Sequence, residues 1–295
     1  MRPTRPPQRT VDAHLHLWDL DVSDYAWLNP QHGALHATFT ADVARTALDL
    51  AGIGSAVLVQ AEDSARDTQF MLDAASRHSW IVGVVGWVRL DDPPEAERQL
   101  QKWRGHPAFC GVRHLVHEDP RENFLSLPSV RRSLKMLADN DIAFDVPDAW
   151  PRHLAATATL AAELPTLRIV LDHLGKPPRA PAEHRRWLHE LRPLAAQPNT
   201  VAKVSGLQLP GEPFTVAALR PVWDTALELF GPARLMYGGD WPLTLPYGGY
   251  GPTWQVMSEL IGELSEGEQE LLLAGTAGTV YRLPCSPDPT AGTQR

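Results

Sequence analysis

Eight short apolar segments, each followed by a helical pattern, run through the chain from end to end. The predicted strands span 10–16, 55–60, 81–89, 109–114, 142–146, 168–171, 200–204 and 235–238. Their apolar runs are continuous rather than alternating, which is typical of parallel strands buried on both faces. Eight strand–helix units favour an α/β fold closed as a (β/α)8 TIM barrel. A doubly wound open sheet is the alternative architecture with the same alternation.

The length of 295 residues fits one such barrel or two ordinary domains. No change in composition and no Ser/Gly-rich linker divides the chain, so we expect a single barrel domain over 10–284. Residues 1–9 and 285–295 are expected to be tails, the first of them disordered, because both are polar and rich in Pro or Gly. The helical patterns cover 41–50, 67–78, 94–103, 129–140, 152–163, 181–194, 216–230, 254–264 and 266–274.

Charge and composition exclude several classes of partner. The formal net charge is −8, whereas nucleic acids and anionic membranes attract clustered positive charge. Two cysteines cannot form a disulfide framework in a chain of this length. We find no apolar secretion signal and no stretch long enough to span a membrane, so a cytoplasmic location is expected. The sequence leaves the oligomeric state open between monomer and homodimer.

A pair of histidines, His14 and His16, stands at the end of the first predicted strand. Side chains at i and i+2 of a strand point to the same face, so both imidazoles can face the barrel mouth. Two imidazoles on one face are a common arrangement of metal ligands. A histidine pair at a hydrated strand end would give the same pattern.

Two further strand ends carry groups that suit catalysis. His173 follows the sixth strand, before a Gly-Lys-Pro turn, and suits a metal ligand, a general acid or a capped turn. Asp240 follows the eighth strand and suits a metal ligand, a base for water or an Asx-turn residue. Because the first and eighth strands become neighbours when a barrel closes, His14, His16 and Asp240 are expected to converge.

Basic side chains mark two more strand ends. Arg113 and His114 end the fourth strand, and Lys203 lies near the end of the seventh. Cations at a barrel mouth can bind a carboxylate or a sugar-acid oxygen. A solvated or salt-bridged rim is the other interpretation, above all for Lys203.

Aromatic residues lie in two segments that are too long for simple turns, 17–39 and 239–253. Long irregular loops in a compact domain are usually functional. Trp27, Trp241 and Tyr247 are therefore candidates for the wall of a substrate pocket. Packing within the loops is the alternative role for these rings.

Six motifs together resemble the amidohydrolase-related TIM-barrel lactonases, a group with sugar-acid lactonases, sulfomuconolactonase and the pyrone-dicarboxylate lactonase. The motifs are Asp12–Asp19, Asp24–Leu28, Gly111–His114, Leu171–Pro177, Lys203–Gly206 and Arg234–Pro242. They occur in the family's order, and the resemblance covers about 11–283. One position departs from the family's pattern, since Gly239 stands where a serine usually precedes Asp-Trp-Pro.

The resemblance implies hydrolysis of a small lactone, the cyclic ester of a sugar acid or a muconate-type acid. It places His14, His16 and His173 in the site, makes Asp240 the general base for water, and directs Arg113 to the substrate. The expected partner is thus a small-molecule lactone or carboxylic acid. The alternatives are a metal-dependent decarboxylase of an aromatic acid on the same barrel and a non-catalytic binder of small ligands.

Metal use varies within the group that the chain resembles. Some members are similar to zinc enzymes, whereas the pyrone-dicarboxylate type works without metal. In this chain Asp145 and Asp148, not a histidine, stand at the end of the fifth strand, and no bridging lysine ends the fourth. The resemblance thus argues against a binuclear site. It implies either one divalent ion, zinc before others, bound by His14, His16 and Asp240 with His173 as a further ligand, or a metal-free site.

Overall fold

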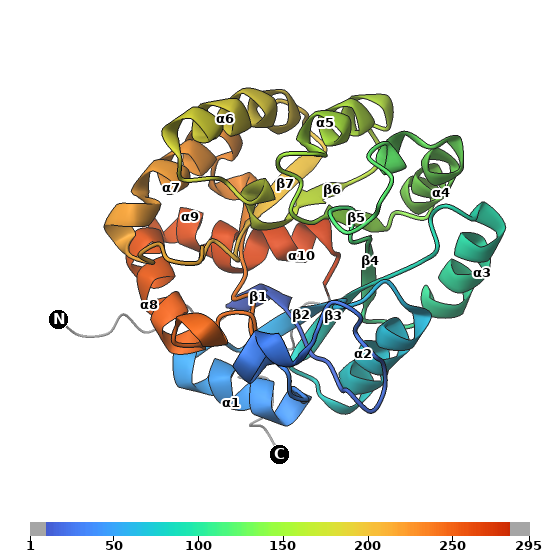
Figure 1. The fold of residues 1–295 in the computed structure, drawn as a ribbon, viewed down its shortest axis with the longest axis horizontal. Coiled ribbons are helices and arrows are strands. Elements are labelled where there is room, and N and C mark those ends of the chain that lie inside the picture. Colours follow the sequence, from blue (N-terminus) through green and yellow to red (C-terminus); the bar gives the residue numbers. More distant parts are fainter. Residues whose placement is uncertain (1–9, 284–295) are drawn as a thin grey trace, which may run out of the picture.

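The computed structural model describes residues 10–283, which form eight parallel strands surrounded by helices (Figure 1). The strands are β1 Val11–Leu15, β2 Ser55–Val59, β3 Ile81–Gly86, β4 Phe109–Arg113, β5 Ala143–Val146, β6 Ile169–Leu171, β7 Thr200–Val204 and β8 Leu235–Tyr237. They lie side by side in chain order, every neighbouring pair parallel. The predicted (β/α)8 TIM barrel is confirmed.

The helices follow the strands in the expected alternation. They are α1 Ala41–Ala51, α2 Ala65–Arg77, α3 Pro93–Trp103, α4 Pro128–Asp139, α5 Leu154–Glu163, α6 Pro181–Ala195, α7 Val216–Phe230, α8 Tyr250–Ile261, α9 Glu266–Glu270 and α10 Thr276–Val280. Helices α1 to α8 form a ring around the strands (Figure 1). Among residues 10–283, no helix is both long and apolar enough to cross a membrane.

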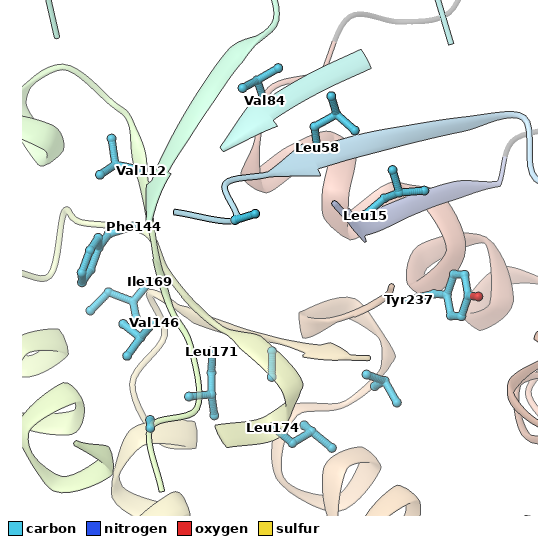
Figure 2. Close-up of a cluster of buried hydrophobic side chains, with 14 of the residues drawn as sticks. Leu15, Leu58, Val84, Val112, Phe144, Val146, Ile169, Leu171, Leu174 and Tyr237 are labelled. Carbon is cyan, nitrogen blue, oxygen red and sulfur yellow. The ribbon is translucent and has the colours of Figure 1, made fainter. Parts of the chain in front are cut away.

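Two apolar layers pack on the two faces of the strands. Outward-facing side chains such as Leu58, Val84, Phe144 and Leu171 meet the helices, and Figure 2 shows them pointing away from the barrel axis. Alternate residues, among them Val57, Val85, Val170 and Met236, fill the barrel interior. The alternation follows from the strand period of two residues. Both layers are apolar, which explains the continuous apolar runs in the sequence.

The end of the chain differs from the expected single helix over 266–274. Helix α9 continues into a π-helical turn, Leu271–Gly275, and then into α10. In Figure 1, α10 lies across the centre of the ring of helices. Its Ala277 and Val280, with the adjoining Tyr281, pack against the interior layer of the strands. The helical pattern of α10 escaped prediction because its five residues are too short to show a period.

Strands β1 and β8 close the barrel through the segment that follows β8. The backbone N–H of Asp240 donates to His14 O at 2.7 Å, and that of His16 donates to Trp241 O at 2.8 Å. Of the three residues predicted to converge, His14 and Asp240 are therefore hydrogen-bonded to each other through their backbones at the seam. The predicted long loops shorten in the structure, since Pro30–Leu35 forms a 3-10 helix and α8 begins at Tyr250. The predicted tails, 1–9 and 285–295, lie outside the described residues.

Candidate functional site

Three ligand-type atoms from β1 and from the segment after β8 converge at the barrel mouth. His14 Nε2 lies 3.1 Å from His16 Nε2. Asp240 Oδ1 lies 3.7 Å from His14 Nε2 and 3.5 Å from His16 Nε2. All three side chains are buried. The convergence expected for these residues is therefore present.

The hydrogen bonds around His16 and Asp240 leave electron pairs of these two residues directed at each other and at His14 Nε2. His16 Nδ1 lies 2.7 Å from Val59 O, which can only accept, so Nδ1 carries the proton and Nε2 is bare. Asp240 Oδ1 is buried and accepts no hydrogen bond from the described residues. Burial lowers the pKa of both His14 and His16, which favours neutral imidazoles. Bare acceptors this close together repel one another unless a cation or a proton lies between them.

The arrangement fits a metal ion. Tetrahedral zinc with bonds of about 2.0–2.1 Å to nitrogen or oxygen separates its ligand atoms by roughly 3.3 Å. The observed separations of 3.1, 3.5 and 3.7 Å lie around that value. His14, His16 and Asp240 form one of the two His/Asp groups among the described residues that are close enough to hold an ion. The other group, His14, Asp172 and His173, shares His14 with it.

The surroundings of Asp240 favour its ionised carboxylate form. Burial alone would raise its pKa, but the charge interaction with His173 and the contacts with His16 and His14 outweigh burial and leave the pKa below its ordinary value. Its backbone φ is 54°, a left-handed conformation that is uncommon outside glycine. Strained backbone of this kind is concentrated at functional sites, where the surrounding structure enforces it.

His173 lies beside the same cluster, with its ring centroid 4.5 Å from that of His14. It lies in the 3-10 turn Asp172–Gly175 that follows β6, with φ at 55°. Its Nδ1 lies 2.9 Å from Ser205 Oγ, and its Nε2 lies 4.0 Å from Asp240 Oδ1. Burial lowers its pKa. At this distance from Asp240, a neutral His173 is suited to exchanging a proton with bound water or substrate.

Asp12 fixes the segment that carries Asp240. Its Oδ1 accepts hydrogen bonds from the backbone N–H groups of His14 and Gly239, and its Oδ2 accepts one from Tyr250 Oη. A Cβ at Gly239 would lie 2.4 Å from the Tyr250 ring and 2.5 Å from Asp12 Oδ2. This packing thus requires glycine at position 239, where the lactonases that the sequence resembles usually have serine. Burial raises the pKa of Asp12 to about 7.

A cavity of about 160 Å³ opens beside His16. His16, His173 and Arg113 line it, as predicted, and Trp27 forms part of its wall. The indole N–H of Trp27 donates to Ala61 O at 2.8 Å, which holds the ring in place. These four sequence-predicted residues therefore share one pocket. His14 and Asp240 do not line it, but their ligand atoms lie 3.1 and 3.5 Å from His16 Nε2.

Four other predicted residues do not line this cavity. His114 is buried, stacked on Phe124, and its ring nitrogens face carboxylates of Asp63 and Asp119 at 3.0 and 3.3 Å. The rings of Trp241 and Phe39 pack edge to face. Tyr247 is half-buried in the short 3-10 helix Leu245–Tyr247.

Lys203 is the fourth of these residues. It is fully buried, and its Nζ lies 2.6 Å from Asp145 Oδ2 and 3.0 Å from Asp172 Oδ1. The salt-bridged alternative therefore describes Lys203, although in the barrel interior rather than at a rim.

Sequence reasoning missed five polar or aromatic residues of the cavity wall. They are Trp18, His117, Glu118, Asp148 and Lys176. Every one of them follows a strand at its carboxyl end, which is the signal that pointed to the other site residues. The direction of a side chain in an irregular turn has no period, so the sequence did not separate these residues from their neighbours.

Comparison with known proteins agrees with this geometry. The amidohydrolase family model matches residues 11–283. Two L-fucono-1,5-lactonases are each 32% identical to the chain, one from Burkholderia multivorans over 93% of this chain and 96% of its own length, and one from Burkholderia ambifaria over 82% and 83%.

A crystal structure of an amidohydrolase from Burkholderia multivorans with bound zinc superposes with a TM-score of 0.84 at 32% identity, covering 94% of this chain and all of that one. Family model, relatives and structure agree over nearly the whole barrel. The chain therefore belongs to the amidohydrolase family.

Proposed function

We propose that this protein hydrolyses the cyclic ester of a hydroxylated sugar acid, with a divalent metal ion, zinc first, at His14, His16 and Asp240. The observation that carries the proposal is the convergence of three buried ligand atoms, His14 Nε2, His16 Nε2 and Asp240 Oδ1, next to an open cavity that His16 lines. The L-fucono-1,5-lactonase relatives and the zinc in a similar structure support it.

The chemistry follows from the groups around the cluster. A divalent ion bound there would polarise the lactone carbonyl as a Lewis acid. Asp240 takes a proton from water as the water oxygen bonds to the carbonyl carbon. The bond from that carbon to the ring oxygen then breaks, and the ring oxygen receives the proton. His173, whose Nε2 lies 4.0 Å from Asp240 Oδ1, transfers it.

The charges of the cavity wall favour a neutral, hydroxyl-rich substrate. The guanidinium of Arg113 is already engaged, since it faces Asp172 Oδ2 at 3.3 Å and donates to Gln60 O. Lys176 Nζ donates to Gly206 O at 3.0 Å. The carboxylates of Glu118 and Asp148 also line the wall. Carboxylates accept hydrogen bonds from sugar hydroxyls but repel a second substrate carboxylate.

A substrate panel tests the proposal. Acid release would be followed with a pH indicator on L-fucono-1,5-lactone, on its stereoisomers and on 2-pyrone-4,6-dicarboxylate, and decarboxylation of an aromatic acid would be followed in parallel. Each assay is run on the purified protein, after chelation and after zinc is added back. We expect turnover of the sugar lactones that chelation removes and zinc restores.

Three outcomes would count against the proposal. Faster hydrolysis of 2-pyrone-4,6-dicarboxylate than of the sugar lactones would contradict the proposal that the wall carboxylates repel charged substrates. Decarboxylation without lactone hydrolysis would identify the other chemistry expected of this barrel. Binding of sugar lactones without any turnover would identify a non-catalytic binder.

A further inference from the structure

One ring nitrogen of His14 lies between a hydrogen-bond acceptor and a hydrogen-bond donor. His14 Nδ1 is 3.3 Å from Asp172 Oδ1 and 3.3 Å from Lys203 Nζ. All three side chains are fully buried. Only one of these contacts can be a hydrogen bond at a time, because a neutral imidazole nitrogen either carries a proton or accepts one.

The two choices at Nδ1 have opposite consequences at Nε2. If Nδ1 carries the proton and donates to Asp172, Nε2 is bare and faces His16 Nε2 and Asp240 Oδ1, as a metal ligand must. If Nδ1 instead accepts from Lys203, Nε2 carries the proton. That proton then points at His16 Nε2, which lies 3.1 Å away and is bare. The second form lets one imidazole donate to the other without a cation, and it also leaves the protonated Nε2 3.5 Å from Arg113 Nη1, which can only donate.

Asp172 and Lys203 are held in place whichever form His14 adopts. Arg113 Nη1 lies 3.3 Å from Asp172 Oδ2. Asp145 Oδ2 lies 2.6 Å from Lys203 Nζ and accepts a hydrogen bond of the same length from Tyr281 Oη. These partners come from β4, β5 and the residue that follows α10. The donor and the acceptor are therefore preorganised, and the His14 proton is the part of this arrangement that can move.

We propose that Asp172 and Lys203 are positioning residues that select the tautomer of His14. Asp172 favours the form that offers Nε2 to a metal ion, and Lys203 favours the form that satisfies the site without one. The inference rests on the proposed metal site at His14, His16 and Asp240. A carboxylate that orients a ligating histidine in this way typically changes metal affinity by about 10- to 100-fold.

Two variants that break the same buried ion pair separate this role from a merely structural one. Zinc affinity of the metal-stripped protein would be measured by competition with a chromophoric chelator for the wild type, Asp172→Asn and Lys203→Met. We expect Asp172→Asn to weaken zinc binding by about 10- to 100-fold. Lys203→Met should bind zinc as tightly as the wild type or more tightly. Thermal unfolding of the metal-free proteins shows how much each variant is destabilised.

The zinc affinities of the two variants and of the wild type test the inference and the proposed metal site separately. If both variants bound zinc more weakly and to the same extent, the inference would be overturned. The ion pair would then affect zinc binding only by stabilising the fold. Weaker zinc binding in Lys203→Met but not in Asp172→Asn would overturn the inference as well. A wild type that binds no zinc would instead refute the proposed metal site, so the two failures are distinguishable.

A measurement on the wild type covers the case in which either variant fails to fold. The ¹⁵N shifts of the His14 ring, assigned by their loss in His14→Gln, report which nitrogen carries the proton. We expect a protonated Nε2 in the metal-free protein and a protonated Nδ1 after zinc is added. A protonated Nδ1 in both states would overturn the inference.

Discussion

The backbone N–H of Asp240 donates a 2.7 Å hydrogen bond to the carbonyl oxygen of His14, so two candidate metal ligands are bonded across the barrel seam. The side chains of the same two residues meet above that bond, with Asp240 Oδ1 3.7 Å from His14 Nε2. The contacts that close the barrel therefore also hold the backbones of two site residues together. A substitution can act on the site's chemistry alone only if it leaves this backbone contact intact.

Asp240→Asn meets that condition, because it changes one side-chain oxygen to an amide and leaves the backbone N–H free to bond His14. The amide cannot take a proton from water and is a poorer metal ligand than a carboxylate. We expect lactone hydrolysis to fall by about 10²–10⁴-fold, the usual range for loss of a general base. Initial rates with a pH indicator measure this, and circular dichroism checks the fold. Near-full activity in this variant would refute the role of Asp240 as base.

Gly206 allows His173 and Asp240 to approach each other. A Cβ at this position would lie 2.4 Å from His173 Nδ1 and 2.6 Å from Asp240 Oδ2. Its φ is also +54°, which an alanine adopts only with strain. We expect Gly206→Ala to reduce kcat by more than about tenfold and to lower zinc affinity, because the added atom displaces both side chains.

Gly211→Ala is the matched control for this substitution. Gly211 has a φ of +77°, but a Cβ added there would have no atom of another part of the chain within 4 Å. Strain at positive φ is thus common to both variants, while the clash belongs to Gly206 alone. Similar losses of zinc affinity in the two variants, measured by chelator competition, would show that backbone strain and not the site contact is responsible.

The fold and the centre of the site were accessible from the sequence for one physical reason. Strand periodicity fixes which residues face inward, and barrel closure makes the first and eighth strands neighbours, so His14, His16 and Asp240 were predicted to meet. Lys203 shows the limit of this reasoning. Its place on β7 pointed to the barrel mouth, but the carboxylates that draw it into the interior belong to Asp145 on β5 and to Asp172 in the turn after β6.

The wall of the cavity was less accessible, because turns lack periodicity. His117 and Asp148 line it from irregular segments after β4 and β5, whereas Trp241, in a comparable segment, packs against Phe39 instead. Whether a turn residue faces the cavity depends on tertiary contacts such as the bond from Trp27 Nε1 to Ala61 O. The sequence pointed to the loop over 17–39, which supplies Trp18 and Trp27, but not to the turns after β4 and β5, which supply His117, Glu118 and Asp148.

Trp27 should therefore affect substrate binding more than turnover. Its ring lines the cavity, where it packs edge to face on Trp18 and His32 rather than on the histidines of the proposed metal site. We expect Trp27→Ala to raise KM by about tenfold with little change in kcat, because uniform binding is lost while the reacting groups stay in place. Steady-state kinetics with a sugar lactone measure both constants. A fall in kcat with an unchanged KM would contradict this assignment.

Asp67 anchors the loop that carries Trp27 and makes the stability of the protein depend on pH. It is fully buried on α2, where its Oδ1 accepts from Tyr25 Oη and its Oδ2 from the backbone N–H of Ala61, both at 2.9 Å. Burial outweighs these hydrogen bonds and raises its pKa from 3.8 to about 7. The folded protein thus holds a proton that the unfolded chain releases near pH 4.

Because the pKa of Asp67 is higher in the folded protein than in the unfolded chain, the protein becomes less stable as the pH rises. Below about pH 4 Asp67 is protonated in both states, and its contribution to stability is fully present. As the pH rises to about 7, the unfolded chain gives up the proton more readily, so the free energy of unfolding falls. Relative to Asp67→Asn, which cannot ionise, we expect the wild type to lose roughly 2–4 kcal/mol between pH 4.5 and 8.

Urea unfolding at the two pH values, with a chelator present, measures this loss. Asp73→Asn, on the exposed part of the same helix, serves as the control and should behave as the wild type. Asp12 also has a raised pKa, but it is unchanged in all three proteins, so the comparison isolates Asp67. Parallel pH dependence in the wild type and in Asp67→Asn would show that Asp67 is already ionised in the folded protein at low pH, contrary to the effect of its burial.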